Sequence, residues 1–460
     1  MELSNLSAGA LREAFVRRTV SPVEVLRAVR ARAEAVEPRL NALWAVAFES
    51  AEARARAAEA RFKIGEPLGP LDGVPVTVKE NLATAGLAMP LGTAAAELAP
   101  APADSPPVAR MRAGGLVDFA RTTMPDYGML SSGLSSFHKL ARNPWDLTKT
   151  PGGSSSGAGA AGAAGYGPLH IGTDIGGSVR LPAGWCGLFG LKPSLGRIPI
   201  DPPFPGRAAG PMTRDVADAA LFMAVLTGPD ARDHMSLPPA DIDWEALDGD
   251  PAGLRVGLLL DAGCGLPVDP ETRAAVEAAA RVFEAAGAVV EPMRPFLTRD
   301  MLDGQDRFWR ARGWSDIASL PEDRRAKILP FIRAWIERAA NYSGEDVYSG
   351  FAQSMAIRKA TVDATQQYDF VLSPTAPIAA FPAELASPTD DPQRPFEHIA
   401  FTLPFNMSEQ PAASINCGYT SGGLPIGLQI AGRRFDDPGV LRMSRFYEQA
   451  RPAPRPWPMD

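Results

Sequence analysis

The sequence predicts an α/β fold, because short segments rich in β-branched residues alternate with longer helical segments along most of the chain. The 460 residues are 45% hydrophobic and 22% charged, which is typical of a soluble globular protein with a large core. Length alone predicts two or three domains. No internal repeat is present, so repeat architectures are excluded.

The first half of the chain begins with helices and then alternates. Residues 1–65 are expected to be helical, with a capping box at Ser21–Glu24 and Pro22 at the first helical position. Val74–Lys79 predicts a short buried strand that ends in a lysine. The other expected elements are a helix at 105–113, a strand at 116–120, a helix at 155–165, and a strand, a loop and a second strand within 168–183.

The second half continues the alternation. The expected helices are 215–227, 270–286, several within 300–366, and 437–450. The expected strands are 254–260, 288–291, 370–373, 412–416 and 426–430. Residues 228–252 are rich in proline and aspartate and predict a connection, and the proline-rich tail 452–460 predicts an extended segment on the surface.

Charge and cysteine content limit the classes of function. The net charge is −7 and no cluster of Lys or Arg is present, so we expect neither a nucleic-acid nor a membrane partner. The three cysteines, Cys186, Cys264 and Cys417, form no zinc-binding pattern with the four histidines and are expected to be buried thiols. No signal peptide or membrane span is apparent, so we expect a cytoplasmic protein.

The segment 150–192 is unusually rich in glycine and serine. Dense glycine suggests backbone that turns through positive φ or approaches a ligand closely. Ser154 and Ser178 each follow a Gly-Gly pair, and the turn at Ile175–Ser178 could point several N–H groups at one oxyanion.

Common catalytic motifs do not explain this segment. Gly157–Gly162 matches the dinucleotide pattern GxGxxG, but no strand precedes it, and the chain contains no P-loop and no GxSxG motif. His170 lies within the segment, yet a core or surface role is expected for each histidine. A serine nucleophile would then need a lysine base, and Lys79 at the end of a buried strand is a plausible one.

Six motifs together resemble the amidase signature family. They are Gly73–Lys79, Asn143–Asp146, Pro151–Ser155, Gly172–Arg180, Gly187–Pro193 and Gly423–Gln429. The similarity covers most of the chain and is strongest between about residues 66 and 230. It implies one α/β domain with a large mixed, twisted sheet covered by helices on both faces, in which a helical segment 1–65 packs on a catalytic core of 66–460.

The resemblance also implies a Ser–cis-Ser–Lys triad. Ser178 would be the nucleophile, Ser154 the bridging serine after a cis peptide bond, and Lys79 the base. The oxyanion hole would consist of the N–H groups of Ile175, Gly176, Gly177 and Ser178. The supporting residues would be Thr173, Asp174 and Arg180. The family needs no metal and no cofactor.

Hydrolysis of a small-molecule amide is the expected function. Phe308, Trp309, Trp314 and Trp335 favour an apolar or aryl substrate if they line its channel, although they could equally form a helix core. A carbamate hydrolase with the same mechanism stays open. We expect segment 200–211 and the helices of about 296–345 to shape the substrate pocket, and a homodimer is one assembly found among relatives.

Three further alternatives are less favoured by the sequence. The resemblance includes the glutaminase component of the tRNA-dependent Glu/Gln amidotransferase, but the position of its glutamine-binding arginine falls near Ser354, one turn before Arg358. A non-catalytic binding protein is disfavoured because all three triad residues are present. A cysteine amidase using Cys186 lacks its accompanying Glu and Lys motifs.

Overall fold

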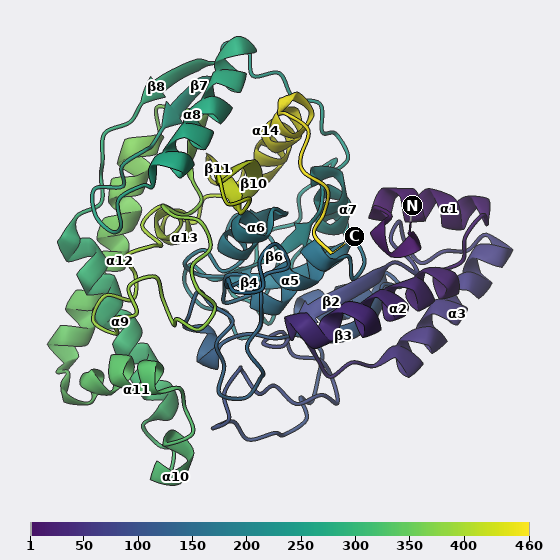
Figure 1. Ribbon diagram of the computed structural model, residues 1–460, viewed down its shortest axis with the longest axis horizontal. Coiled ribbons are helices and arrows are strands. Elements are labelled where there is room, and N and C mark those ends of the chain that lie inside the picture. Colours follow the sequence, from purple (N-terminus) through teal and green to yellow (C-terminus); the bar gives the residue numbers. More distant parts are fainter. Residues whose placement is uncertain (1, 460) are drawn as a thin grey trace.

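The computed structural model describes residues 2–459 and contains an 11-stranded mixed β-sheet with helices around it (Figure 1). The strand order is β1-β3-β2-β4-β6-β5-β10-β11-β9-β7-β8. Strands β3, β2 and β4 are parallel, as are β9, β7 and β8, and the strands between these groups are antiparallel. The predicted α/β class with a large mixed sheet is confirmed.

The strands are short, as expected for buried segments of a mixed sheet. Their bounds are β1 (Leu43–Trp44), β2 (Pro75–Lys79), β3 (Val117–Thr122), β4 (Leu169–Asp174), β5 (Phe189–Lys192), β6 (Ala208–Thr213), β7 (Arg255–Leu258), β8 (Val289–Pro292), β9 (Phe370–Pro374), β10 (Ala412–Tyr419) and β11 (Pro425–Gly432).

Most helices begin and end close to the positions that the sequence indicates, but α6 and α13 were not predicted. Their bounds are α1 (Ala8–Arg17), α2 (Pro22–Leu40), α3 (Phe48–Ile64), α4 (Pro106–Ala113), α5 (Ser156–Ala164), α6 (Arg180–Cys186), α7 (Val216–Leu226), α8 (Pro270–Ala285), α9 (Arg299–Ile317), α10 (Glu322–Arg325), α11 (Pro330–Ile336), α12 (Gly344–Thr365), α13 (Leu403–Met407) and α14 (Asp437–Ala450). Short 3-10 turns lie at Leu3–Asn5, Asp126–Gly128 and Glu337–Asn341. The capping box predicted at Ser21 and Glu24 is formed.

One expectation about the sheet was wrong, and one strand was missed. The second strand expected within 168–183 is instead helix α6, because the chain turns at Gly177 and Pro182 then lies in the first turn of a helix, where proline is tolerated. Strand β6 (Ala208–Thr213) overlaps the segment 200–211, which we expected to shape the substrate pocket and to which we assigned no strand. Its sequence Ala-Ala-Gly-Pro-Met-Thr has little intrinsic strand preference, so pairing with β4 and β5 on either side determines its structure.

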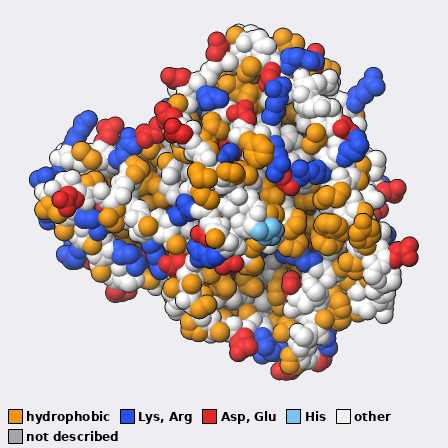
Figure 2. Space-filling model, turned by 180° about the vertical axis from the view of Figure 1, so that it is seen from behind, with side chains coloured by type: hydrophobic (Ala, Val, Ile, Leu, Met, Phe, Trp, Pro, Cys, Tyr) orange, Lys and Arg blue, Asp and Glu red, His pale blue; other side chains and the backbone are white. Residues whose placement is uncertain are grey.

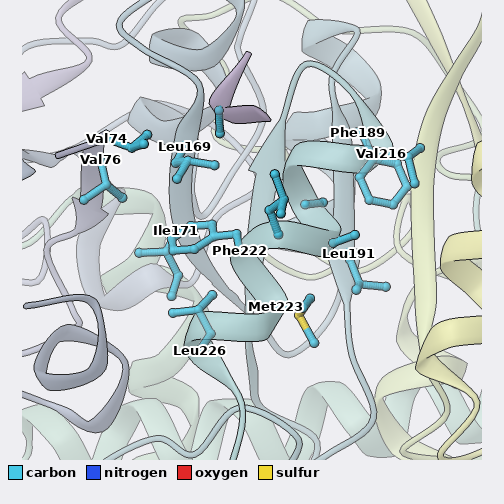
Figure 3. Packing of buried hydrophobic residues seen from close by; sticks show 14 of the residues in the cluster. Val74, Val76, Leu169, Ile171, Phe189, Leu191, Val216, Phe222, Met223 and Leu226 are labelled. Carbon is cyan, nitrogen blue, oxygen red and sulfur yellow. The ribbon is translucent and has the colours of Figure 1, made fainter. Parts of the chain in front are cut away.

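Helix α7 covers one face of the sheet. Its side chains Phe222, Met223 and Leu226 are fully buried, and Figure 3 shows Phe222 beside Ile171 of β4. Burial of a side chain of this size contributes about 1.5–3 kcal/mol to stability. This packing helps to hold β4, the strand that carries Asp174.

Helices α9 to α12 form a second helical layer, and α10 and α11 extend away from the sheet at the lower left of Figure 1. Trp309, Trp335 and Ile336 are buried in a separate core beneath this layer. None of the helices within residues 2–459 has the length and apolar character needed to cross a membrane. On the face shown in Figure 2, acidic and basic side chains are interspersed.

Candidate active site

Lys79 is the last residue of β2 and its side chain is completely buried. Side chains alternate along a strand, so Thr77 and Lys79 lie on the same face of the sheet, opposite the valines of β2. On this face the segment that precedes α5 packs closely against β4, because a Cβ added to Gly172 of β4 would lie only 2.5 Å from Ser155 Oγ. The amine of Lys79 therefore reaches the residues that precede α5.

Only neutral oxygen atoms lie within hydrogen-bond distance of Lys79 Nζ among the described residues. They are Ser154 Oγ at 2.8 Å, Ser155 Oγ at 3.0 Å, Thr173 Oγ1 at 3.1 Å and the Thr173 carbonyl oxygen at 3.5 Å. Burial lowers the pKa of Lys79 to about 7, although the negative charge of Asp174 opposes this change. Near neutral pH a large share of Lys79 is therefore an amine that can accept a proton.

Ser154 and Ser178 lie on neighbouring segments. The Gly153–Ser154 peptide bond is cis, as the resemblance implies, and the N–H of Ser155 donates to the carbonyl oxygen of Ser178 at 3.2 Å. Ser154 is buried between Lys79 and this segment, whereas Ser178 is only half-buried. The structure thus brings the predicted triad residues into one region, with Ser178 nearest to solvent.

Asp174 stabilises the turn that carries Ser178. Its carboxylate accepts hydrogen bonds from the N–H groups of Gly177 at 2.8 Å and Val179 at 3.1 Å, and it forms an ion pair of 2.9 Å with Arg180. Burial opposes the ionised form, but the charge of Arg180 more than compensates and holds the pKa of Asp174 well below its usual range. Asp174 is therefore an anion that shapes the backbone of the turn.

Arg180 connects the same turn to distant parts of the chain that the sequence did not indicate. Its guanidinium donates to the Thr402 carbonyl oxygen at 2.9 Å, to Gln429 Oε1 at 2.6 Å and to Asn406 Oδ1 at 2.6 Å. Asn406 Nδ2 in turn donates to Asp174 Oδ1 at 2.9 Å. Gln429 ends one of the quoted motifs, but nothing in the sequence indicated Thr402 or Asn406.

Three of the four expected oxyanion donors are available. The N–H groups of Ile175, Gly176 and Ser178 have no acceptor within residues 2–459. The N–H of Gly177 instead donates to Asp174, so the expectation that it also binds the oxyanion does not fit this geometry. Gly177 has φ of +120°, and a Cβ there would lie 2.6 Å from Thr402 Oγ1, so glycine is required at this position.

The alternative nucleophiles and bases are engaged elsewhere. His170 is buried between Thr77 Oγ1 at 2.7 Å and the Gly167 carbonyl oxygen at 3.1 Å, and burial lowers its pKa to about 3. His138 is paired with Glu80 at 2.9 Å. Burial raises the pKa of the Cys186 thiol far above its usual range, so this cysteine is a poor nucleophile.

The aromatic residues of α9 and α11 play two roles. Trp309 and Trp335 are buried, which agrees with the interpretation as helix core. Phe308 is half-buried and its ring centroid lies 6.4 Å from that of Phe204. The two segments expected to shape the substrate pocket, 200–211 and about 296–345, therefore meet at this pair.

Comparison with known proteins agrees with the fold and the motifs. The family profile described as Amidase matches residues 24–441. The A subunit of the glutamyl-tRNA(Gln) amidotransferase of Myxococcus xanthus (strain DK1622) is 35% identical, and the match covers 98% of this chain and 98% of that protein.

Solved structures of amidases also superpose on this chain. A bacterial aryl acylamidase of the amidase signature family superposes with a TM-score of 0.89 and 31% identity, covering 97% of this chain and 96% of that one. The peptide amidase of Stenotrophomonas maltophilia superposes with a TM-score of 0.84 and 25% identity, covering 98% of each chain. The chain therefore belongs to the amidase family and is an amidase signature amidohydrolase.

Proposed function

We propose that this chain hydrolyses an apolar or aryl carboxylic amide through an acyl-enzyme on Ser178, with Ser154 and Lys79 as its proton relay. One observation carries the proposal: the buried amine of Lys79 lies 2.8 Å from Ser154 Oγ and has no carboxylate partner among the described residues. A lysine in this environment is a base near neutral pH, and a base is what a serine nucleophile lacks without a histidine.

In the first half of the reaction, the proton of Ser178 passes to Ser154 while the proton of Ser154 passes to the neutral amine of Lys79. Ser178 Oγ forms a bond to the carbonyl carbon, and the carbonyl oxygen becomes an oxyanion. The free N–H groups of Ile175, Gly176 and Ser178 are positioned to donate to it, and such preorganised donors are each worth about 10²–10³ in rate.

In the second half, the C–N bond breaks and the leaving nitrogen takes a proton back along the same relay. Lys79 returns to its neutral form, so the acyl-enzyme is ready for water. Water then loses a proton to the relay as it attacks the ester carbon. Ser178 recovers that proton as the acid leaves.

The aryl preference is supported by one aromatic pair and by one relative. Phe204 and Phe308 pair where the two segments that we expect to shape the pocket meet. The 31% identical structure that covers 97% of this chain is an aryl acylamidase. An aryl carbamate would meet the same nucleophile, so carbamates belong in the substrate panel.

The glutaminase component of the tRNA-dependent amidotransferase is the second candidate, because a relative of that description is 35% identical to this chain. The residues near the position expected for glutamine recognition argue against it. Ser354 donates to Gln305 at 2.7 Å inside the helical layer, and Arg358 forms an ion pair of 2.5 Å with Glu409. Neither side chain is free to bind the carboxylate of glutamine.

The test compares labelling and turnover in matched variants. Wild type should gain one fluorophosphonate adduct in intact mass and should hydrolyse 4-nitroacetanilide or a related anilide. Ser178→Ala should lose both, whereas Ser50→Ala, which alters an exposed helix residue, should keep both. An adduct that persists in Ser178→Ala would exclude the proposed nucleophile, and glutamine hydrolysis without anilide hydrolysis would favour the second candidate.

A further inference from the structure

Arg312 on α9 has no directly bonded anionic partner among the described residues. Its guanidinium carbon lies 4.9 Å from the centre of the Phe204 ring and 5.5 Å from that of Trp309. It makes no hydrogen bond and no ion pair within residues 2–459. Stacking of this kind fixes the plane of a guanidinium but leaves its N–H donors free.

Arg207, immediately before β6, is a second arginine without an ion pair in the part of the chain that the structure describes. One of its nitrogens donates to the Pro202 carbonyl oxygen, while its Nε is buried and has no partner. The backbone N–H of Arg207 donates to the carbonyl oxygen of Phe204 at 3.0 Å, and Arg312 lies over the ring of the same Phe204, so both arginines adjoin one residue. Burial and the positive charge of Arg312 lower the pKa of Arg207 to about 10, although the charges of Asp233 and Asp201 oppose this change. No carboxylate forms an ion pair with either arginine within residues 2–459.

Two other arginines of α9 have carboxylate partners. Arg299 is paired with Glu397 at 2.7 Å and Arg310 with Asp306 at 2.7 Å. Asp316, one helical turn after Arg312, acts on Arg312 through its negative charge but forms no ion pair with it within 4.0 Å. The N–H donors of Arg312 are therefore not occupied by Asp316.

Both arginines belong to segments that border the candidate active site. Ala208, the next residue after Arg207, pairs in the sheet with Asp174, and the positive charge of Arg207 acts on Lys79. Gly313, the next residue after Arg312, packs against Met129, where a Cβ would lie 3.2 Å from the sulfur.

The turn that contains Met129 touches the triad directly. A Cβ on the preceding residue, Gly128, would lie 3.3 Å from Ser154 Oγ. Only the turn of Gly128 and Met129 therefore lies between the segment of Arg312 and Ser154. The segment of Arg207 adjoins the end of β4, from which the chain continues to Ser178.

We propose that Arg207 and Arg312 form a subsite for a carboxylate of the substrate, so that the preferred amides carry a negative charge near the scissile bond. The inference rests on the proposed amide hydrolysis for its location, and it narrows the substrate class. A carboxylate would supply acceptors for the free N–H donors and would neutralise two like charges. Phe204, which Arg312 stacks on, would hold the apolar or aryl part alongside.

The experiment measures binding without turnover. Ser178→Ala is titrated by calorimetry with 4-nitroanilides of malonic, succinic and glutaric acid and with 4-acetamidobenzoate, each beside its neutral methyl ester. The first three place the carboxylate on the acyl side at increasing distance, and the fourth places it on the amine side. At least one acid should bind about 10- to 100-fold more tightly than its ester, which is the range for hydrogen bonds to charged groups.

A second substitution assigns the preference to the subsite. Adding Arg312→Met should bring acid and ester within about twofold of each other, and Arg312→Lys should retain part of the difference because it keeps a charge without the fork of donors. Arg307→Met is the matched control, since Arg307 is an exposed arginine on the same helix. Melting temperatures verify that each variant is folded.

The outcomes separate this inference from the proposed function. Equal binding of acid and ester in every pair would overturn the subsite, as would a preference that survives Arg312→Met in folded protein. If the acid is preferred but wild type cleaves none of the anilides, the subsite stands and the hydrolytic proposal fails. If the esters are cleaved as well as the acids by wild type and bind equally, hydrolysis stands and the subsite fails.

Discussion

The pH dependence of serine acylation provides a direct test of Lys79 as the base. Burial lowers the pKa of this lysine from its ordinary value of 10.5 to about 7. At pH 7, about half of Lys79 is then neutral, whereas about 0.03% would be neutral at the ordinary value. Burial therefore increases the fraction of Lys79 that can accept a proton about a thousandfold at neutral pH.

The assay is the second-order rate of fluorophosphonate labelling, followed by intact mass from pH 5 to pH 10. This reaction reports the free enzyme and needs no protonation of an amine leaving group. The rate should rise about tenfold per pH unit below pH 7, because each unit increases the neutral fraction of Lys79 tenfold, and it should level off above about pH 8.

Two results would refute this reasoning. A rate that climbs steadily to pH 10 would mean that the base keeps an ordinary lysine pKa, so burial does not activate it. A rate that is flat from pH 5 to pH 9 would mean that no group with a pKa near 7 controls the nucleophile. The control is Ser178→Ala, which should show no labelling at any pH.

The remaining predictions concern the relay, the turn and stability. Ser154→Ala should lower anilide kcat by about 10²–10⁴ with a smaller change in KM, because the relay to Lys79 is broken. Gly177→Ala should lower both melting temperature and labelling rate, since its Cβ would lie 2.6 Å from Thr402 Oγ1 at φ of +120°; an unchanged melting temperature would contradict this. Asp174→Asn should move the midpoint of the pH–labelling profile below 7, because the charge of Asp174 favours the ammonium form of Lys79; a midpoint at or above 7 in folded protein would be inconsistent with it. Lys79→Met should stabilise the protein near pH 6 and lose this advantage as pH rises from 7 to 10.5, because over that range the unfolded lysine binds more protons than the folded one; urea unfolding at pH 6 and pH 10 measures the difference, at most on the order of 5 kcal/mol.

Much of the fold was predictable because local sequence and tertiary packing agree. The Val-Pro-Val-Thr-Val-Lys run has a strand preference of its own, and β2 forms there. The segment after Ser178 was expected to be a strand, but the chain turns there into α6. This turn depends on hydrogen bonds from the N–H groups of Gly177 and Val179 to the carboxylate of Asp174, and the sequence alone does not reveal these contacts. Strand β6 was missed because its own residues have little strand preference, and its pairing with β4 and β5 determines its structure.

The residues of the candidate site likewise divide into those that the sequence indicated and those that it did not. Lys79, Ser154 and Ser178 stand in motifs whose spacing can be read directly, so the sequence could nominate them. Thr402 and Asn406 lie more than two hundred residues from the loop that they hold, with hydrogen-bond separations of 226 and 232 positions. A single asparagine or threonine has no distinguishing pattern, so only the folded structure could reveal their role.

The buried pair of Asp174 and Arg180 explains why the catalytic turn depends on both halves of the chain. Removing two charges from water costs several kcal/mol for each ion, and their mutual attraction compensates only if their other hydrogen-bond positions are also filled. Here the backbone of the turn and Asn406 fill those of Asp174, while Asn406, Gln429 and the Thr402 carbonyl fill those of Arg180.

The ion pair is therefore stable only when β4, α6, α13 and β11 are all in place. The same contacts direct the N–H groups of Ile175, Gly176 and Ser178 away from other acceptors. Donors that are held in place before substrate binds need little reorganisation when an oxyanion develops. If these N–H groups form the oxyanion hole, as we propose, then assembly of these four elements is a condition for the chemistry at Ser178.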